Sequence, residues 1–345
     1  MNRFSRKKDI RVGVVGYGGA FNMGRHHLSE MRDAGMTPAA VCELDTARLA
    51  VAREDFEGIE TYRSVSQMLK KSDVNLVTII TPHNTHAPIA LKCLAAGRHV
   101  VTEKPFAITV AECDAMIAAA RKRGLVLSTY HNRHWDGCVL EGVDQIVNRK
   151  VIGDVVSIEI HAGSYSTPGA WWRSSKSISG GLAYDWGVHF LEYALQIMNE
   201  DMLEVTGVSK TGVWASKTKW KADTNEDAVH ALVRFANQKW LTLSMSGIEC
   251  IPKSGFMEVR GTRGAYIMDH NTFEIIQPKS NGRFVRTTGP NRAGVWGEFY
   301  KNIADHMSRG KKLVITPEWA RRPIQILDTA NRSAKSGKAI KLKYR

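Results

Sequence analysis

Three polar side chains have the types and positions that hydroxyl chemistry requires: Lys104, Asp185 and His189. Lys104 follows the apolar run 99–102, and the carboxyl end of a parallel strand lies at the edge of the sheet where ligands bind. Asp185 and His189 are four residues apart, so on one helix their Cβ atoms lie about 6 Å apart on the same face. An imidazole can accept a hydroxyl proton near neutral pH, and a carboxylate can anchor a hydroxyl or orient the ring. An exposed polar pair is the alternative, which the apolar neighbours of His189 disfavour.

A glycine-rich turn follows the first apolar strand, expected at 10–16. Glycines let backbone N–H groups approach a pyrophosphate, and the N-terminus of the next helix favours anions. The third glycine of the usual fingerprint is displaced, because Phe21 holds its position and Gly24 comes three residues later. This spacing predicts a lengthened turn, and the strand before it favours a dinucleotide site over an ordinary tight turn. The cofactor contacts expected here are Gly16, Gly18, Gly19, Ala20 and Phe21.

Glu43 ends the second expected strand, where an acid can hydrogen-bond the ribose hydroxyls of a dinucleotide. Its charge also repels a 2′-phosphate, so the sequence favours NAD over NADP. Arg48, one helical turn later, could accept a phosphate, and Glu43 could instead be a surface acid that opens the next helix with Asp45. We therefore expect NAD, with NADP as the less favoured cofactor.

The turns after two later strands supply the remaining expected cofactor contacts. A lone histidine in such a turn is more often structural than catalytic, so we give His86 a cofactor-lining role at most. His131 and His134 lie near Asp136, but no further ligand has a matching spacing, so we expect no metal site. The expected contacts beyond the glycine turn are Glu43, Thr81, Pro82, His83, His86, Glu103 and Lys104.

Two segments of the expected second domain have the composition of a substrate pocket, namely 131–133 and 171–173. Aromatic faces and polar forks suit sugar and cyclitol rings, whereas Arg133, Arg173 and Lys176 could also meet a carboxylate, sulfonate or phosphate. The tryptophans could equally cover a seam between domains. The candidate substrate-binding residues are Asn132, Arg133, Trp172 and Arg173.

Composition narrows the class of protein. Lys and Arg exceed Asp and Glu, giving a formal net charge of +14, but the basic residues are spread along the chain without a nucleic-acid-binding motif. We expect a solvated basic surface and no nucleic-acid partner, with an anionic substrate left open. No apolar run is long enough to span a bilayer, and residues 1–9 lack an apolar signal core. Five scattered cysteines indicate reduced thiols, so we expect a cytoplasmic protein.

The order of expected elements predicts two domains. Strands at 10–16, 38–43, 75–80, 99–102 and 125–129 alternate with helical patterns, which gives a parallel sheet covered on both faces. Asp45, Ser64 and Asn84 are the expected helix caps. After a helix near 136–149 come a strand and a helix at 182–198. Consecutive strands then follow at 203–214, 227–235, 239–247, 256–260, 264–269 and 273–277, which favour an open, mostly antiparallel sheet.

We place a dinucleotide-binding domain at 1–130 and a substrate-binding and oligomerisation domain at 131–345. Helices near 294–309 and 317–334 close the chain, and whether they pack on the first domain is open.

With these motifs in place, the chain resembles the glucose–fructose oxidoreductase and inositol dehydrogenase family, often written Gfo/Idh/MocA. The resemblance covers nearly the whole chain and depends on the pairing of Glu103-Lys104-Pro105 with Gly180-Gly181…Asp185…His189. The glycine turn, Thr81-Pro82 and the segment 332–337 add to it. It implies an α/β fold with a Rossmann domain followed by an α+β domain, with NAD or NADP lying across the strand ends.

The resemblance also implies roles for the three polar side chains. Lys104 would polarise the reacting oxygen and help to move its proton, His189 would be the general acid/base, and Asp185 would position a neighbouring hydroxyl. The implied reaction is hydride transfer between a secondary hydroxyl of a sugar, polyol or cyclitol and nicotinamide. A glycosidase that oxidises its sugar transiently remains an alternative, and a non-catalytic sensor is less favoured because all three residues are present. Most relatives pair through the open sheet face, so we expect a homodimer or homotetramer.

Overall fold

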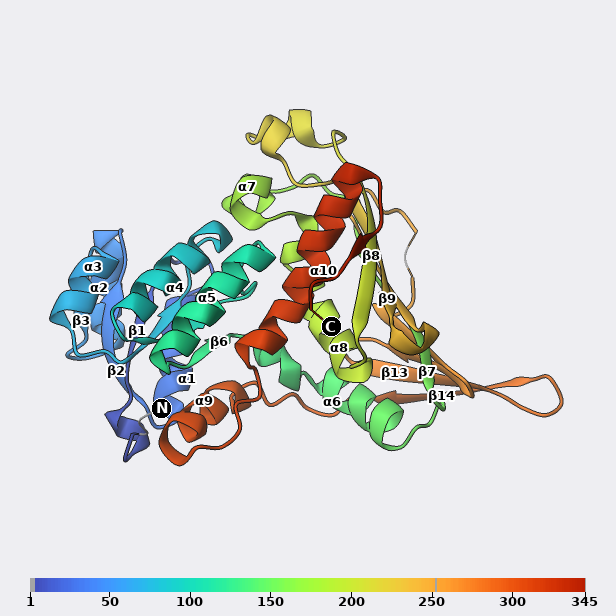
Figure 1. The fold of residues 1–345 in the computed structure, drawn as a ribbon, viewed down its shortest axis with the longest axis horizontal. Helices are drawn as coiled ribbons and strands as arrows, with labels where there is room; N and C mark the ends of the chain where they lie inside the picture. The colour runs from blue at the N-terminus through green and yellow to red at the C-terminus, as the bar shows by residue number, and fades with distance from the viewer. Residues whose placement is uncertain (1–3, 252, 345) are drawn as a thin grey trace. The chain divides into compact units, whose positions relative to one another are not determined.

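The computed structural model describes residues 4–251 and 253–344, drawn as a ribbon in Figure 1. The chain forms two compact units. The first contains the chain through Asn132 together with Gly297–Arg321, and the second contains Arg133–Trp296 and the chain from Arg322 onward. The segment after Trp296 therefore returns to the first unit before the chain ends in the second.

Six parallel strands form the sheet of the first unit, in the order β3-β2-β1-β4-β5-β6. The chain runs outward from β1 in one direction and from β4 in the other, so the carboxyl ends of these two central strands meet at the switch point where ligands bind. The strands are β1 (Arg11–Val15), β2 (Thr37–Cys42), β3 (Glu60–Tyr62), β4 (Leu76–Ile79), β5 (His99–Thr102) and β6 (Leu127–Thr129). The helices between them are α1 (Met23–Asp33), α2 (Thr46–Asp55), α3 (Val65–Lys71), α4 (His86–Ala95) and α5 (Val110–Arg123).

The parallel sheet is confirmed. The helix caps and strands predicted for this unit from local sequence patterns agree with the structure, with two exceptions. Asp45 and Ser64 cap α2 and α3 by accepting backbone N–H groups, as expected. The predicted cap at Asn84 is wrong, because a 3₁₀ turn at His83–Thr85 comes first and α4 begins at His86. The edge strand β3 was not expected, since three half-buried residues are too few to show an alternating pattern.

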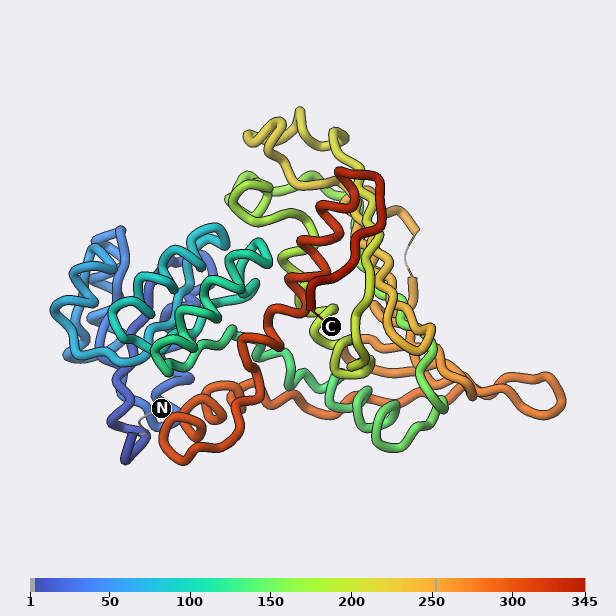
Figure 2. Tube along the Cα trace, in the orientation of Figure 1, coloured from blue at the N-terminus to red at the C-terminus, as the bar shows by residue number. Residues whose placement is uncertain are grey.

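A late segment of the chain completes the first unit. Helix α9 (Glu298–Arg309) packs against α1, and Phe4 N–H donates to Met307 O at 3.0 Å. Figure 2 shows the two ends of this unit, far apart in the sequence, side by side along the tube. Lys7 Nζ also pairs with Asp305 Oδ1 at 2.7 Å. The α9 segment therefore belongs to the body that carries the glycine turn.

Nine strands form the sheet of the second unit, in the order β14-β13-β12-β11-β7-β10-β9-β8-β15. Every neighbouring pair is antiparallel except β7 with β10, which confirms the mostly antiparallel sheet. The strands are β7 (Val155–Gly163), β8 (Met202–Lys210), β9 (Ala228–Phe235), β10 (Trp240–Ser246), β11 (Met257–Gly261), β12 (Gly264–Met268), β13 (Thr272–Pro278), β14 (Phe284–Pro290) and β15 (Ile340–Lys341). The helices are α6 (Gly137–Val143), which continues as a π-helix at Asp144–Asn148, α7 (Lys176–Ser179), α8 (Gly187–Ile197) and most of α10 (Pro317–Ser336).

One face of this sheet carries the core. Along β10 the side chains alternate between exposed or half-buried and buried, and the buried ones, such as Leu241 and Leu243, face the side on which α8 packs. Almost every residue of α8 is buried, so its position on the sheet is well determined by apolar contact. This helix carries His189.

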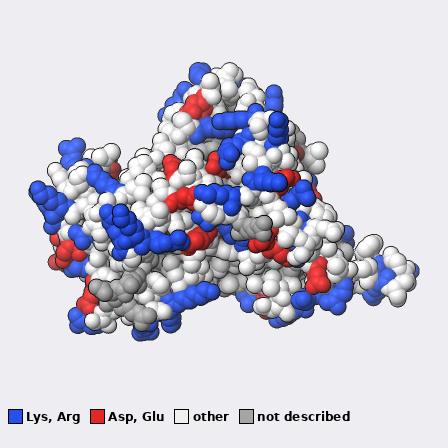
Figure 3. Space-filling model, in the orientation of Figure 1, with Lys and Arg blue, Asp and Glu red and all other residues white. Residues whose placement is uncertain are grey.

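The surface and thiols agree with a charged exterior over an apolar interior. In Figure 3 the Lys and Arg side chains on the visible face are spread over both units with Asp and Glu between them. All five cysteines are free thiols, and four of them are buried. Within residues 4–251 and 253–344, no helix is both long and apolar enough to cross a membrane.

Candidate active site

The glycine turn after β1 combines glycines that the fold requires with one that it does not. Gly16 has φ 102°, and a Cβ there would lie 2.8 Å from Ile80 O. A Cβ at Gly24 would lie 2.5 Å from the Tyr17 ring and 2.9 Å from Gly16 O, so Gly24 lets α1 pack against the turn. Gly18 is exposed, and a Cβ there would meet nothing within 4 Å. The space around Gly18 therefore does not by itself require a glycine.

The turn is lengthened, as the displaced glycine predicted. Asn22 is in the left-handed region (φ 49°), and α1 begins at Met23 without a side-chain cap. Gly18, Gly19, Ala20 and Phe21 are all exposed in front of this helix N-terminus. Exposed backbone beside an uncapped N-terminus fits a pyrophosphate, so the segment could hold NAD(P).

Glu43 is built into the base of the same turn. Its carboxylate accepts backbone N–H groups from Tyr17 (2.6 Å), Leu44 (2.6 Å) and Asp45 (3.1 Å). Arg48 lies on the other side, where Nε donates to Tyr17 O at 2.9 Å and Nη2 donates to Asn22 Oδ1 at 3.1 Å. The turn therefore has a fixed negative group at its base and a fixed positive group beside it.

His86 links the two turns that follow β4 and β5. The side chain is fully buried, with Nε2 2.9 Å from Thr81 O and Nδ1 2.8 Å from Pro105 O. Burial lowers the pKa of His86 below its ordinary value, against the opposite effect of the two carbonyls. Thr81 and Thr85 share a hydroxyl contact at 2.6 Å, and Thr85 Oγ1 donates to Pro82 O. The buried His83 ring lies 5.7 Å from that of His86.

A buried polar chain holds the backbone of Lys104. Glu103 Oε2 accepts the N–H of Lys104 at 2.9 Å, and Glu103 Oε1 lies 3.0 Å from His27 Nε2. The Nδ1 of His27 is 2.7 Å from the hydroxyl of Tyr300, which is 3.2 Å from Thr78 Oγ1. Burial raises the pKa of Glu103, but the hydrogen bond and charge of His27, together with Lys104, outweigh it and lower the pKa to about 2. Because Glu103 is an anion, His27 Nε2 is the donor of this contact.

Asp185 and His189 do not lie on one helix, which corrects the prediction for this pair. A 3₁₀ turn at Leu182–Tyr184 precedes Asp185, and α8 begins only at Gly187. His189 lies in the first turn of α8, buried, with its ring 5.7 Å from that of Trp186. Asp185 stays one-third exposed. The sequence pattern treated the helix as continuous from 182, but a 3₁₀ turn, Asp185 and Trp186 precede the first residue of α8.

Arg173 and Asp185, predicted separately for substrate and catalysis, form one ion pair. Arg173 Nη1 donates to Asp185 Oδ1 at 2.7 Å. The guanidinium also lies over the rings of Trp171 (5.1 Å) and Trp172 (5.3 Å). Asn225 Nδ2 donates to the carbonyl of Arg173 at 2.7 Å and fixes its backbone. The pair makes Asp185 an acceptor of fixed orientation.

Arg133 has a similar environment built around a different carboxylate. Its Nη1 donates to Asp136 Oδ2 at 3.0 Å, and its guanidinium lies over Trp186 (4.8 Å) and Trp296 (5.5 Å). Asp136 also accepts from the hydroxyl of Tyr193 and the Nε1–H of Trp296. Burial and the charge of Asp136 raise the pKa of Tyr193 well above 10, so the phenol is a donor. Asn132, just before, is the last residue of the first unit and opens the 3₁₀ turn Asn132–Trp135.

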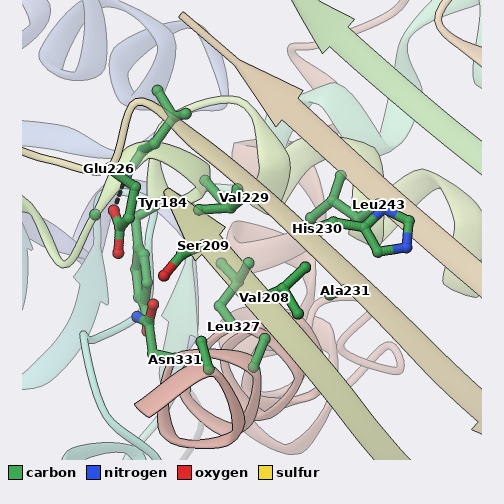
Figure 4. A pocket seen from close by; sticks show the side chains of 15 residues that line it. Tyr184, Val208, Ser209, Glu226, Val229, His230, Ala231, Leu243, Leu327 and Asn331 are labelled. Atoms are coloured by element: carbon green, nitrogen blue, oxygen red, sulfur yellow. Dashed lines mark hydrogen bonds between the residues drawn. The ribbon is translucent and has the colours of Figure 1, made fainter. Parts of the chain in front are cut away.

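The Gly180-Gly181 turn rests on a buried acid that the sequence did not single out. Glu226 is almost fully buried, pairs with Lys176 and accepts the N–H of Leu182 at 3.1 Å. A Cβ at Gly181 (φ 131°) would lie 2.7 Å from Glu226 Oε2, so only glycine fits there. Figure 4 shows Glu226 and Tyr184 at one side of a cavity of ≈ 20 Å³, room for about one water, with Asn331 of α10 below them. This acid fixes the segment that leads to Asp185.

A larger hollow of ≈ 830 Å³ lies at the ends of β7 and β10 in the second unit. Its lining includes Phe190, Phe256 and His270, and none of the predicted site residues is among the described residues that line it. The predicted residues of the second unit instead gather around Asp185 and Trp186.

Sequence reasoning missed the residues that support the predicted ones. His27, Tyr300, Asp136 and Glu226 are each buried: His27 contacts Glu103, Tyr300 contacts His27, Asp136 contacts Arg133, and Glu226 pairs with Lys176. Buried polar groups need partners, so a polar residue within an apolar helix face was the available signal. His27 stands on α1 between the buried Gly24 and Leu28, which is such a signal.

The fold and the glycine turn define a dinucleotide-binding protein with a second unit that carries polar and aromatic side chains around a helix N-terminus. Two family models match the chain. The model "Oxidoreductase family, NAD-binding Rossmann fold" covers residues 10–131, and the model "GFO/IDH/MocA C-terminal domain" covers residues 141–267. The chain belongs to the GFO/IDH/MocA family of NAD(P)-dependent oxidoreductases.

Individual relatives agree with this family. The chain is 23% identical to scyllo-inositol 2-dehydrogenase (NADP⁺) IolW of Bacillus subtilis over 98% of each protein. It is 26% identical to myo-inositol 2-dehydrogenase of Thermotoga maritima over 57% of each. Among solved structures, a levoglucosan dehydrogenase in complex with NADH and levoglucosan superimposes with a TM-score of 0.81 over 97% of this chain and 99% of the other, at 20% identity. That last likeness shows the fold alone.

Proposed function

We propose that this oxidoreductase transfers hydride between a secondary hydroxyl of a sugar, polyol or cyclitol and nicotinamide. The observation that carries the proposal is that Lys104, Asp185 and His189 all occur, each held by buried or ion-paired neighbours, in a chain whose two units both match one oxidoreductase family. The relatives named for inositols support this substrate class.

The proposed roles follow from the surroundings of each side chain. NAD(P), when bound, supplies the hydride acceptor. Lys104, an ammonium at the carboxyl end of β5, polarises the reacting oxygen and helps to move its proton. His189 is the general acid/base, because imidazole exchanges protons near neutral pH. Asp185, whose charge is paired with Arg173, accepts a hydrogen bond from a neighbouring hydroxyl and so positions the ring.

We propose NAD rather than NADP as the preferred cofactor. Three backbone N–H groups hold the carboxylate of Glu43 at the base of the turn. A 2′-phosphate placed next to it would meet like-charge repulsion. Arg48 works in the opposite direction, but its guanidinium is already bonded to Tyr17 O and Asn22 Oδ1.

The test is NADH or NADPH formation by the purified protein across inositols, aldoses, glycosides and acidic sugars. We expect the fluorescence of the reduced nicotinamide to rise when the protein is mixed with one class of compound. The Lys104→Ala variant should show no such rise. A glycoside consumed with no net NADH, on the other hand, would replace the dehydrogenase by a redox-neutral glycosidase. If a ring binds but is not converted, the protein would be assigned as a non-catalytic sensor.

A further inference from the structure

Two arginines of the second unit each lie over the rings of two tryptophans. Arg133 lies over Trp186 and Trp296, and Arg173 lies over Trp171 and Trp172, at 4.8–5.5 Å from the ring centroids. Asp185 and Trp186 are consecutive, and one binds Arg173 while the other contacts Arg133, so the two groups are joined. We name these two arginines and four tryptophans the Arg–Trp wall.

Each cation that the sequence offers to an anionic substrate already has a carboxylate of its own. Arg133 pairs with Asp136 at 3.0 Å, and Arg173 pairs with Asp185 at 2.7 Å. Lys176 pairs with Glu226, whose side chain is 1% exposed. The charges of these three cations are therefore offset by the charges of their three partner carboxylates.

The geometry makes these cations poor receptors for a further anion. A carboxylate or phosphate that leaves water needs an unpaired cation or several donors in exchange. Drawing Arg133 away from Asp136 would leave a buried carboxylate without its guanidinium, which is costly in a partly desolvated site.

The same wall suits an uncharged ring. Trp171, Trp186 and Trp296 remain 38%, 38% and 45% exposed, although large aromatics are usually more buried. A sugar or cyclitol has an apolar C–H face that can stack on an indole and a hydroxyl edge that can reach polar groups. Asp185, one-third exposed and fixed by Arg173, is an acceptor for such a hydroxyl.

We propose that the Arg–Trp wall binds an uncharged polyhydroxylated ring and discriminates against the same ring carrying a carboxylate or phosphate. The inference rests on the proposed function, since it assumes that this part of the second unit meets the substrate. It goes further by deciding between neutral and acidic substrates, which the isolated arginines and lysine leave open.

Calorimetric binding to the NAD-saturated protein tests the proposal with matched rings: glucose against glucuronate, and myo-inositol against myo-inositol 1-phosphate. We expect at least one neutral member to bind about tenfold more tightly than its acidic partner, equivalent to about 1.4 kcal/mol. Equal or tighter binding of the acidic member would overturn the proposal, and so would the absence of binding by every ring.

Charge variants then ask whether the paired carboxylates cause the preference. Asp136→Asn frees the charge of Arg133, and we expect the neutral-to-acidic affinity ratio to fall at least threefold. Asp154→Asn is the matched control, because Asp154 pairs with Lys150 on an exposed surface, and it should leave the ratio unchanged. If Asp136→Asn does not fold, Asp185→Asn serves instead, because it removes the carboxylate charge paired with Arg173. For this variant only the neutral-to-acidic affinity ratio is measured, not turnover. An unchanged ratio in the folded variant contradicts the mechanism.

Turnover separates this inference from the proposed function. Preferential binding of the neutral ring without NADH formation from any ring would refute the dehydrogenase and keep the preference. Faster NADH formation from the acidic ring would support the dehydrogenase and overturn the preference.

Discussion

The two units hold their reactive side chains by different physical means. In the first unit a largely buried chain of Glu103, His27 and Tyr300 anchors the backbone of Lys104. In the second unit Asp185 is held by Arg173 among partly exposed tryptophans. Electrostatic contacts are strong and intolerant of change where water is excluded, and weaker where solvent screens them. We therefore expect single substitutions to cause large losses of activity or stability in the first unit and smaller changes in the second.

We expect the largest loss of activity from a substitution of Lys104, the residue whose backbone the buried chain of the first unit anchors. Lys104→Ala removes the ammonium from the end of β5, and we expect kcat/KM to fall about 10³-fold, as the loss of a general acid–base group does. NAD binding, measured by calorimetry, should remain detectable. Lys122→Ala, at an exposed position of α5, is the control. Turnover close to normal in Lys104→Ala would remove the lysine from the mechanism.

Breaking the buried chain should cost stability as well as activity. His27→Ala leaves the carboxylate of Glu103 without its donor, and we expect unfolding free energy to drop by about 3 kcal/mol. The neighbouring His26 has a 43% exposed side chain, so His26→Ala should cost less than about 1 kcal/mol. Urea unfolding followed by circular dichroism measures both. Equal losses in the two variants would show that burial does not distinguish them.

His27 should also act on kcat through Lys104. We expect His27→Ala to lower kcat more than it raises KM, because the lysine loses its fixed position while the rest of the site persists. His27→Gln keeps a donor and should recover part of kcat. A change in stability alone, with kcat intact, would make His27 purely structural.

Acid should act on the first unit in a defined window. The pKa of Glu103 is about 2 in the folded protein against an ordinary 4.5, so its stabilisation is present above pH 4.5 and is lost as pH falls toward 2. Burial lowers the pKa of His99 from 6.5 to about 4, so His99 contributes a separate loss as pH falls between those values. Thermal unfolding of Glu103→Gln against pH should flatten the lower window only. A wild-type-like slope there would contradict the assignment.

In the second unit the expected effect is smaller. Arg173→Met removes the partner of Asp185 while keeping an unbranched side chain against the tryptophans, and we expect KM to rise about tenfold with stability changed by less than about 1 kcal/mol. Arg286→Met is the matched control, because Arg286 pairs with Glu274 at 2.6 Å on the exposed hairpin. A loss of several kcal/mol would show that Arg173 supports the fold rather than the ligand.

Cofactor choice should change least. Glu43→Ser removes the charge at the base of the glycine turn but keeps a hydroxyl acceptor, and we expect the NAD-to-NADP ratio of kcat/KM to fall about fivefold, or about 1 kcal/mol. Steady-state rates with both cofactors measure it. An unchanged ratio would assign Glu43 to the turn alone, where it accepts three backbone N–H groups.

Local patterns predicted the parts of this molecule that depend on neighbours in sequence. The parallel and antiparallel sheets, the caps at Asp45 and Ser64 and the lengthened glycine turn all follow from periodicity, cap chemistry and glycine spacing. The cap at Asn84 and the single helix through Asp185 failed because short 3₁₀ turns leave no distinct pattern.

The sequence by itself determined which residue types stand at the strand ends and around α8, and hence the class of chemistry. Only the tertiary structure decided their partners. Tyr300 reaches His27 from 273 residues away, Trp296 reaches Asp136 from 160, and Glu226 meets Lys176 from 50. Such pairings depend on how the whole chain packs, because a buried charge takes whichever partner the fold brings to it, and no local pattern encodes that choice.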